Sequence, residues 1–374
     1  MRPAPAPPFR AEHIGSLVRP PELLHARERH AAGAIDSAEL RAVEDKAIAA
    51  VVRLQEDLGL AVVTDGEFRR GTYSDSFTSS GISGVKIEMT EDQGWTRSQT
   101  HGHRMARRIP AVVDRIVWKG PQNAEDFRYL KSLTARTPKI TLPGPCYIHY
   151  RAGRANISRD VYPDLDAFWS DLVAAYAKEM RSLADVGCSY LQIDETSLVK
   201  LGDPRVQQLL RERGDDWSDL LRSYIGVVNA VVAAAPKDMT IGIHVCRSQD
   251  PSWQADVGYD PIAEPLFQEM KVNSYFLEYD NARAGTFAPL RAVPAGKFVV
   301  LGLVASRARE LESADLLKSR IEEASRCVAL DQLGLSPQCG FSTSAAEHVA
   351  VTEEVEKAKL ARIVEVARQV WGSA

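Results

Sequence analysis

Residues 239–246 read MTIGIHVC, and the interpretation of the whole chain starts from this short stretch. The run is apolar and rich in β-branched residues, as in a buried strand of a parallel sheet, yet it ends on His244 and Cys246. Residues two apart on a strand point to the same face, so both of these side chains enter the same space. Burying such polar groups is costly unless they contact a ligand or one another. The stretch therefore indicates a parallel strand whose carboxyl end carries function.

Other segments of the chain are also short, largely apolar runs, and most of them end on or lead directly into polar or glycine residues. They are 11–16, 61–67, 139–142, 189–195, 275–278, 297–303 and 335–339. Helical patterns separate most of them, at 36–59, 164–186, 204–235, 261–270 and 353–371. Alternating strands and helices predict an α/β protein with a parallel sheet, and eight strands favour a closed (β/α)8 TIM barrel over an open sheet. We expect a single catalytic barrel domain over residues 1–374.

Three local features add detail to this barrel. The segment 84–138 is polar, irregular and too long for an ordinary connection, so we expect an inserted hairpin or lid after the second strand. Asp36 and Glu39 have the spacing of a capping box, which predicts the start of a helix. The charged run 353–357 is expected to be a solvated face at a helix N-terminus, where acidic residues suit the helix dipole.

Composition excludes several classes of partner. The net charge of −4 gives no electrostatic attraction to nucleic acid or to an anionic membrane. No apolar run approaches the ~20 residues that a helix needs to cross a bilayer. Five scattered cysteines do not resemble a disulfide framework and suit a reducing compartment. We expect a cytoplasmic protein with small-molecule substrates, and homodimerisation stays open.

Four residues at the strand ends are of types that bind borderline and soft metal ions. Glu278 and Cys339 end two later apolar segments, as His244 and Cys246 end the first. In a barrel these ends meet at one mouth, and a mixed nitrogen, sulfur and carboxylate set suits Zn²⁺ better than Mg²⁺ or Ca²⁺. Two alternatives remain: the histidine and cysteine could be packed core residues, and Glu278 could pair with Arg283.

Six short motifs occur along the chain: HIGS at 13–16, DGEFRR at 65–70, LQIDE at 191–195, HVC at 244–246, FLEYD at 276–280 and PQCGF at 337–341. In these motifs and in their order, the chain resembles the catalytic, C-terminal half of cobalamin-independent methionine synthase. It is most similar to the stand-alone, single-barrel members of that family. The resemblance implies an S-methyltransferase in which Zn²⁺ is bound by His244, Cys246, Glu278 and Cys339.

The resemblance also implies an amino-acid pocket. Gly15 and Ser16 would bind the carboxylate of homocysteine, while Glu67 and Asp194 would bind its ammonium group and act as the catalytic residues. The implied reaction is methyl transfer to the homocysteine sulfur to give methionine, because a coordinating thiol is deprotonated and the thiolate is the nucleophile. From the residues alone, Asp194 and Glu195 point to opposite faces of their strand; the resemblance selects Asp194 as the inward one.

The methyl donor stays open, whether folate, corrinoid or another molecule. Long family members carry a second barrel that helps to bind folate polyglutamate, to which nothing in these 374 residues corresponds, and the family histidine after the seventh strand has no counterpart in 302–307. His149, Tyr150, Arg151 and Arg154 follow the third strand, and they could bind an anionic donor or remain solvated. The alternative functions are alkyl transfer to another thiol, as in the related epoxide:coenzyme M transferases, and a non-catalytic barrel that binds zinc or thiols.

Overall fold

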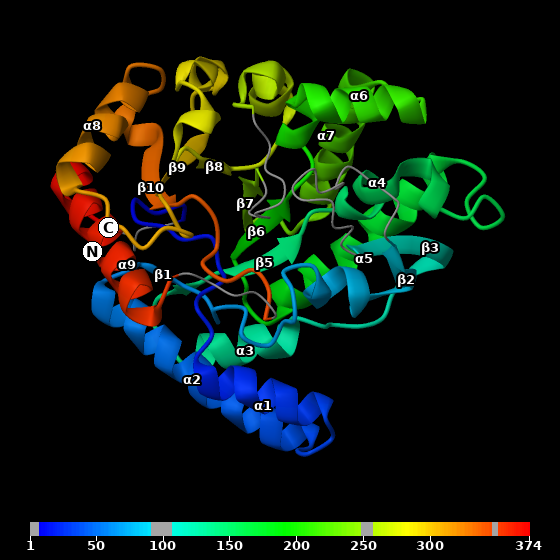
Figure 1. Cartoon of the computed structure of the whole chain (residues 1–374), viewed down its shortest axis with the longest axis horizontal. Helices are drawn as coiled ribbons and strands as arrows, with labels where there is room; N and C mark the ends of the chain where they lie inside the picture. The colour runs from blue at the N-terminus through cyan, green and yellow to red at the C-terminus, as the bar shows by residue number, and fades with distance from the viewer. Residues whose placement is uncertain (1–6, 91–106, 248–256, 346–350) are drawn as a thin grey trace, which may run out of the picture.

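The computed structural model describes residues 7–90, 107–247, 257–345 and 351–374, and its main feature is a parallel sheet (Figure 1). The strand order is β10-β9-β8-β7-β6-β5. The strands are β5 (Ile140–Pro143), β6 (Tyr190–Glu195), β7 (Thr240–Val245), β8 (Ser274–Glu278), β9 (Phe298–Val304) and β10 (Leu333–Pro337). Every neighbouring pair is parallel, so all of the carboxyl ends lie at one end of the sheet. The predicted α/β class with a parallel sheet is confirmed.

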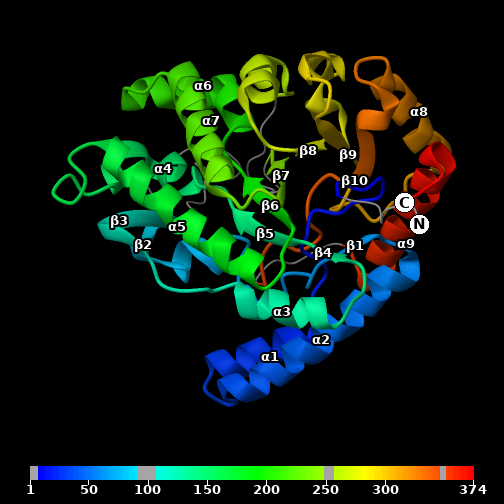
Figure 2. The ribbon, with the colours of Figure 1, turned by 180° about the vertical axis from the view of Figure 1, so that it is seen from behind.

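Helices lie around the outside of this sheet, with α1, α2 and α3 along one side and α8 with α9 along another (Figures 1 and 2). The α-helices are α1 (Pro21–Ala31), α2 (Ser37–Leu58), α3 (Ala124–Ser132), α4 (Tyr147–Ala152), α5 (Leu165–Asp185), α6 (Pro204–Arg213), α7 (Trp217–Ala234), α8 (Ala314–Ser325) and α9 (Glu353–Trp371). Strands buried along their whole length pack against them in one large core. In the described part of the chain, no helix combines the length and apolarity needed to span a bilayer.

The eight-stranded ladder of a closed barrel is only partly present. β1 (Val62–Val63) pairs with β4 (Thr137–Pro138) in a separate two-stranded sheet. The segment 11–16 makes one isolated parallel bridge, between Ala11 and Leu335 of β10. The described residues therefore form a parallel sheet that is consistent with a barrel, but its hydrogen-bonded ladder is not closed as predicted.

Gly15 interrupts the extended conformation of the first segment. Gly15 has φ +148°, a backbone conformation that differs from that of a regular strand and favours glycine. Its carbonyl accepts a hydrogen bond from the Thr64 hydroxyl over 2.7 Å, and Leu17 N donates to Gly66 O over 3.1 Å. These two hydrogen bonds, one from the Thr64 side chain and one between backbone groups after Gly15, hold the first two extended segments together in place of a strand ladder.

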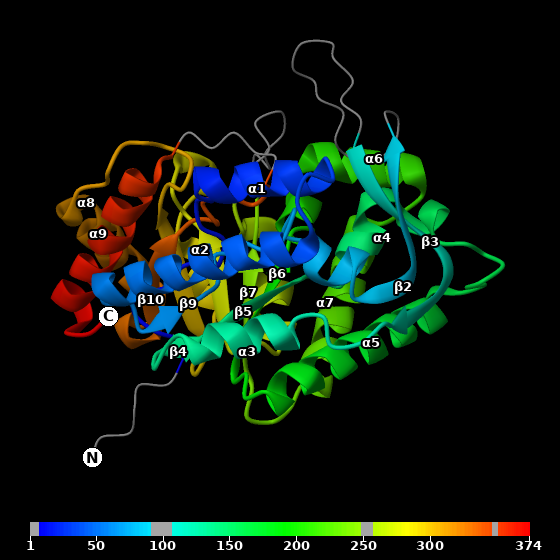
Figure 3. The same cartoon turned by 90° about the horizontal axis from the view of Figure 1, so that it is seen from below.

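The segment 84–138 contains both a hairpin and a helix. β2 (Ile82–Thr90) and β3 (Arg107–Trp118) pair in antiparallel fashion, and α3 follows them. Residues 91–106, which join the two strands, lie outside the described residues. Figure 3 shows the pair at the side of the molecule, next to α4 and α5. A lid function for this segment stays a prediction.

The helix predictions succeed where a strong signal marks an end. Asp36 accepts hydrogen bonds from two amides of the first turn of α2, and Glu39 accepts one from the Asp36 amide, so the capping box is confirmed. The predicted helix 204–235 is wrong in one respect, because Asp216 caps a new helix and divides it into α6 and α7. The segment 261–270 holds only a 3₁₀ turn and a π turn, since Pro265 lacks the amide that a continuous helix would need.

The N-terminus of α9 also differs from its prediction. The sequence predicts that Glu356 lies in a solvated face, but it is 1% exposed and its carboxylate accepts a hydrogen bond from Val18 N over 2.7 Å. Lys359, one turn later, is buried as well and pairs with Glu312 over 3.0 Å. The first turns of α9 therefore dock onto the body of the protein.

Candidate metal centre

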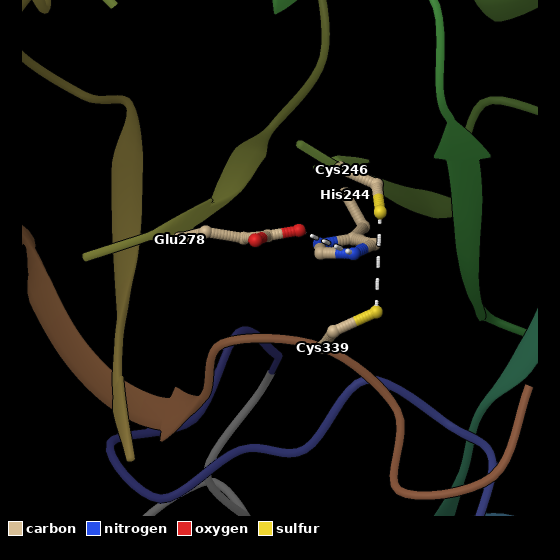
Figure 4. Close-up of side chains that lie close together, drawn as sticks. All are labelled: His244, Cys246, Glu278 and Cys339. Carbon is tan, nitrogen blue, oxygen red and sulfur yellow. Dashed lines mark hydrogen bonds and ion pairs between the residues drawn. The ribbon is translucent and has the colours of Figure 1, made fainter. Parts of the chain in front are cut away.

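Four buried side chains converge at the carboxyl end of the sheet. His244 lies in β7, Cys246 directly follows it, Glu278 ends β8, and Cys339 lies two residues beyond β10. Figure 4 shows the four side chains pointing toward one another, and their ligand atoms all lie within 4.8 Å of each other. The two sulfur atoms are 4.0 Å apart, and His244 Nε2 is 4.0 Å from Glu278 Oε1. Within the described residues, this is the one group with the composition and spacing of a metal site.

The geometry of this group fits Zn²⁺. Bond lengths of about 2.0–2.3 Å in a tetrahedral site place ligand atoms roughly 3.3–3.8 Å apart, close to the separations seen here. His244 Nδ1 lies 3.3 Å from the carbonyl of Phe276, which fixes the ring and leaves the other nitrogen for a metal. That nitrogen, Nε2, is buried and has no hydrogen-bond partner among the described residues. A buried nitrogen without a partner is costly, and a metal ion would satisfy it.

The pKa shifts of these residues also favour a bound cation. Burial raises the pKa of Glu278 well above its ordinary value. The hydrogen bond between the two thiols lowers the pKa of Cys246 and raises that of Cys339, because one proton is shared between them. Together these shifts disfavour the fully ionised cluster in the absence of a cation. A divalent ion would stabilise the ionised forms.

An acidic pair lies beside the metal ligands. The Thr141 hydroxyl donates to Glu67 Oε1 over 2.8 Å, while Glu67 Oε2 is buried without a partner in the described part of the chain. Asp194 pairs in register with His244 across β6 and β7. Burial, followed by the charge of Glu67, raises the pKa of Asp194 to about 7. A cationic group placed between the two carboxylates would relieve this repulsion.

Gly15 and Ser16 lie against this same site. A Cβ on Gly15 would come within 2.7 Å of the Thr141 side chain and 3.1 Å of Glu67 Oε1, so only glycine fits there. A Cβ on Gly340 would lie 2.0 Å from Ser16 Oγ, which brings the serine hydroxyl against the backbone next to Cys339. The residues predicted for the amino acid and for the metal are thus neighbours.

Gln192 is a site residue that the sequence analysis did not identify. Its Nε2 donates to Asp194 Oδ1 over 2.7 Å and to Ile14 O over 2.6 Å. Lys139 donates to Gln192 Oε1 over 3.0 Å, and a lysine can only donate, so the amide nitrogen must face Asp194. Alternation along β6 could have placed Gln192 on the same face as Asp194.

Glu195 faces away from the site, as alternation along the strand predicts. Its Oε1 accepts hydrogen bonds from the Ser197 amide over 2.9 Å and from the Ser197 hydroxyl over 2.6 Å. Its other oxygen accepts from Cys146 N over 3.4 Å. Glu195 is therefore held by the loop after β6, and Asp194 is the inward carboxylate.

Comparisons with known proteins match the chain almost from end to end. Residues 9–369 match a family model described as the catalytic domain of cobalamin-independent synthase. The uncharacterized protein YxjG of Bacillus subtilis is 39% identical over 369 residues, which cover 98% of this chain and 95% of YxjG. A protein of Pyrococcus abyssi named methionine synthase is 25% identical over 352 residues, or 94% of this chain and 91% of its own. A Listeria monocytogenes crystal structure, described as a candidate vitamin-B12-independent methionine synthase, covers 99% of this chain and 100% of its own at TM-score 0.76 and 32% identity.

Proposed function

The chain belongs to the cobalamin-independent synthase family through its catalytic domain, and from this premise we propose that it is a zinc-dependent S-methyltransferase. Its acceptor is a thiol, homocysteine, and its product is methionine. The observation that carries this proposal is the buried His, Cys, Glu and Cys cluster beside a buried acidic pair. The Pyrococcus relative named methionine synthase, which aligns over nearly its whole length, supports the choice of acceptor.

Each half of the site has a distinct task in this reaction. His244, Cys246, Glu278 and Cys339 would hold Zn²⁺, which supplies the positive charge that favours the thiolate form of a substrate thiol. Holding the acceptor at both ends fixes the position of its sulfur, which removes most of the entropic cost of bringing it to the methyl group. A sulfur–carbon bond then forms while the bond from the methyl carbon to the donor breaks, and the donor keeps the electron pair.

The amino-acid half selects the acceptor. Glu67 and Asp194 present two buried carboxylates to an ammonium group, and Gly15 with Ser16 offers an amide and a hydroxyl to a carboxylate. A thiol that carries a sulfonate in place of an ammonium group would meet repulsion from both acids. This arrangement favours homocysteine over coenzyme M as the acceptor.

Metal content is the first test. We expect about one zinc per chain in protein purified without chelator or affinity metal, and a loss of most of it in Cys339→Ser, because four ligands hold a structural or catalytic ion far better than three. Cys327→Ser, at a half-buried cysteine outside the cluster, serves as the control and should keep its zinc. A well-folded wild type that takes up no zinc even after reconstitution would refute the proposal.

Acceptor choice is tested with cobalt-substituted protein, whose absorption reports sulfur ligation. Homocysteine should bind at least about tenfold more tightly than 1-propanethiol, since charge-assisted hydrogen bonds to the ammonium group are lost in the latter. Glu67→Gln should remove most of that preference. Equal affinities for the two thiols, or a preference for 2-mercaptoethanesulfonate, would exclude homocysteine as the acceptor.

A further inference from the structure

The polar residues that follow the third predicted strand have very different surroundings. His149 is buried, and its Nδ1 lies 2.8 Å from the hydroxyl of Tyr224. Arg154 donates to the carbonyls of Ile157 and Tyr162 and thereby holds the loop after α4. These contacts use both side chains within the fold. Arg151 is the cation of this group whose role the fold does not explain.

Arg151 lies among aromatic rings rather than carboxylates. Its guanidinium carbon is 5.4 Å from the ring centroid of Tyr147, which makes an edge contact with Tyr73 at 5.9 Å. Its Nε is buried and has no hydrogen-bond partner among the described residues. The guanidinium interacts with the Tyr73 hydroxyl, but no carboxylate pairs with it in the described part of the chain. A partly buried permanent cation without a carboxylate partner favours binding of an anion.

This cation lies on the metal-centre side of the molecule. Arg151 is in α4, directly after β5, and β5 pairs with β6, whose following loop carries Lys200. Burial, and then the charge of Arg151, lowers the pKa of Lys200 to about 8, while Cys246 and Glu278 oppose the shift. The buried ammonium group of Lys200 is therefore close both to Arg151 and to two of the metal ligands.

Tyr73 also connects the surroundings of Arg151 with the loop that follows β6. Its hydroxyl lies 3.4 Å from Thr196 Oγ1, in the loop that follows β6. Burial raises the pKa of this phenol, and the neighbouring Tyr147 and the more distant Cys246 act in the same direction. Besides the acidic pair, the candidate metal ligands thus have an aromatic and cationic group in their surroundings.

We propose that Arg151, flanked by Tyr73 and Tyr147, binds an anionic group of the methyl donor, such as a carboxylate, a sulfonate or a phosphate. This inference rests on the proposed methyl transfer, in which the charged groups of homocysteine already have partners, so the anion belongs to the second substrate. The transfer leaves the bonding electron pair on the donor, whose charge becomes more negative by one unit. A fixed cation next to that group stabilises the change.

The test uses zinc-loaded protein saturated with homocysteine and two probes of one shape, benzoate and benzamide, titrated by calorimetry. We expect benzoate to bind more tightly than benzamide to the wild type. Arg151→Gln should weaken benzoate by about ten- to a hundredfold and leave benzamide unchanged, as a lost charge-assisted hydrogen bond predicts. Arg151→Lys should retain part of the affinity. Arg159→Gln, which removes an exposed charge from the loop after α4, should behave as wild type.

Four outcomes of this test are separable. Equal benzoate affinity in the wild type and in a folded, zinc-containing Arg151→Gln would overturn the inference. If Arg151→Gln instead weakens homocysteine but not 3-aminopropanethiol, which lacks the carboxylate, Arg151 serves the acceptor and the assignment to the donor is wrong. Absence of zinc or of homocysteine binding in the wild type would refute the proposed function, whereas loss of benzoate binding confined to Arg151→Gln supports the anion site.

Discussion

The orientation of the Gln192 side-chain amide is set by its two ionisable neighbours. Lys139 lies on one side and can only donate, and Asp194 lies on the other and accepts when ionised. The same amide nitrogen also holds the carbonyl of Ile14, which precedes the glycine proposed to bind the carboxylate. One side chain thus positions both the acid and the backbone that the amino acid would contact.

Replacing this amide by an acid should damage acceptor binding specifically. Gln192→Glu removes the donor to Asp194 and adds a negative charge beside it, so we expect the Kd for homocysteine to rise about tenfold or more. Zinc content should stay unchanged, since Gln192 is not among the four ligands that define the metal cluster. The measurement is homocysteine titration of the cobalt form, with the exposed Gln122→Glu as control. An unchanged Kd would show that Gln192 is only structural.

At the scale of residues, the sequence was sufficient for the metal cluster but not for its supporting contacts. The convergence of these four residues could be predicted because polar residues that end buried strands are costly unless they share a ligand. The pairing of Lys139 with Gln192 spans 53 residues and depends on the register of β5 against β6, which no local pattern reveals. The role of Arg151 could not be separated from that of Arg154 until their partners were visible.

Among the elements, α9 shows how a charged helix end can be buried. Glu356 lies at its first turn, where the helix dipole and the Val18 amide both favour a negative oxygen. Burial nevertheless dominates and raises the pKa of this carboxyl to about 8. The protonated form is therefore the stable one in the folded protein near neutral pH.

This burial predicts a pH-dependent stability. Because the folded pKa lies above the unfolded one, the contribution of Glu356 to stability is complete below about pH 4.5 and is lost as the pH rises through about 8. Glu356→Gln keeps the acceptor for Val18 N and removes the titration. Between pH 5 and 8.5 its free energy of unfolding should rise relative to that of the wild type by on the order of a few kcal/mol, and its Tm should rise with it. Parallel Tm profiles for the two proteins would contradict the buried titration.

Elements with strong end signals could be predicted, and those shaped by packing could not. The capping box of α2 and the whole of α9 are visible in the sequence. By contrast, α8 buries only Leu317, Ile321 and Ala324, a stripe too narrow to stand out, and it was not predicted. The strand count suggested a closed ladder, but the first extended segment pairs with β10 only at the Ala11–Leu335 bridge.

At the scale of the whole molecule, the four residues of the candidate metal site join distant parts of the chain. The two cysteines are 93 residues apart, and the group connects β7, β8 and the segment after β10. A bound ion would therefore restrain one half of the sheet. Because it would bind the folded chain far better than the unfolded one, its binding energy adds directly to stability.

Metal removal should consequently lower stability reversibly. We expect a strong chelator to reduce the Tm of the wild type by several degrees, with recovery on adding Zn²⁺ and none on adding Mg²⁺, which does not favour sulfur ligands. Cys339→Ser should start from the lower Tm and respond little to the chelator. Calorimetry with and without chelator provides the measurement, and an identical Tm in both conditions would argue against a bound ion.

The bridge between Ala11 and Leu335 has a consequence for how a ribosome makes this protein. The segment around Ala11 leaves the ribosome first, but it cannot pair until β10, near the end of the chain, has been made. During that interval the nascent chain already exposes His244, Cys246 and Glu278, while Cys339 is still inside the exit tunnel or not yet made. Three of the four candidate ligands are therefore synthesised well before the fourth. Binding of the ion at the complete site is a late step in the synthesis and folding of each molecule.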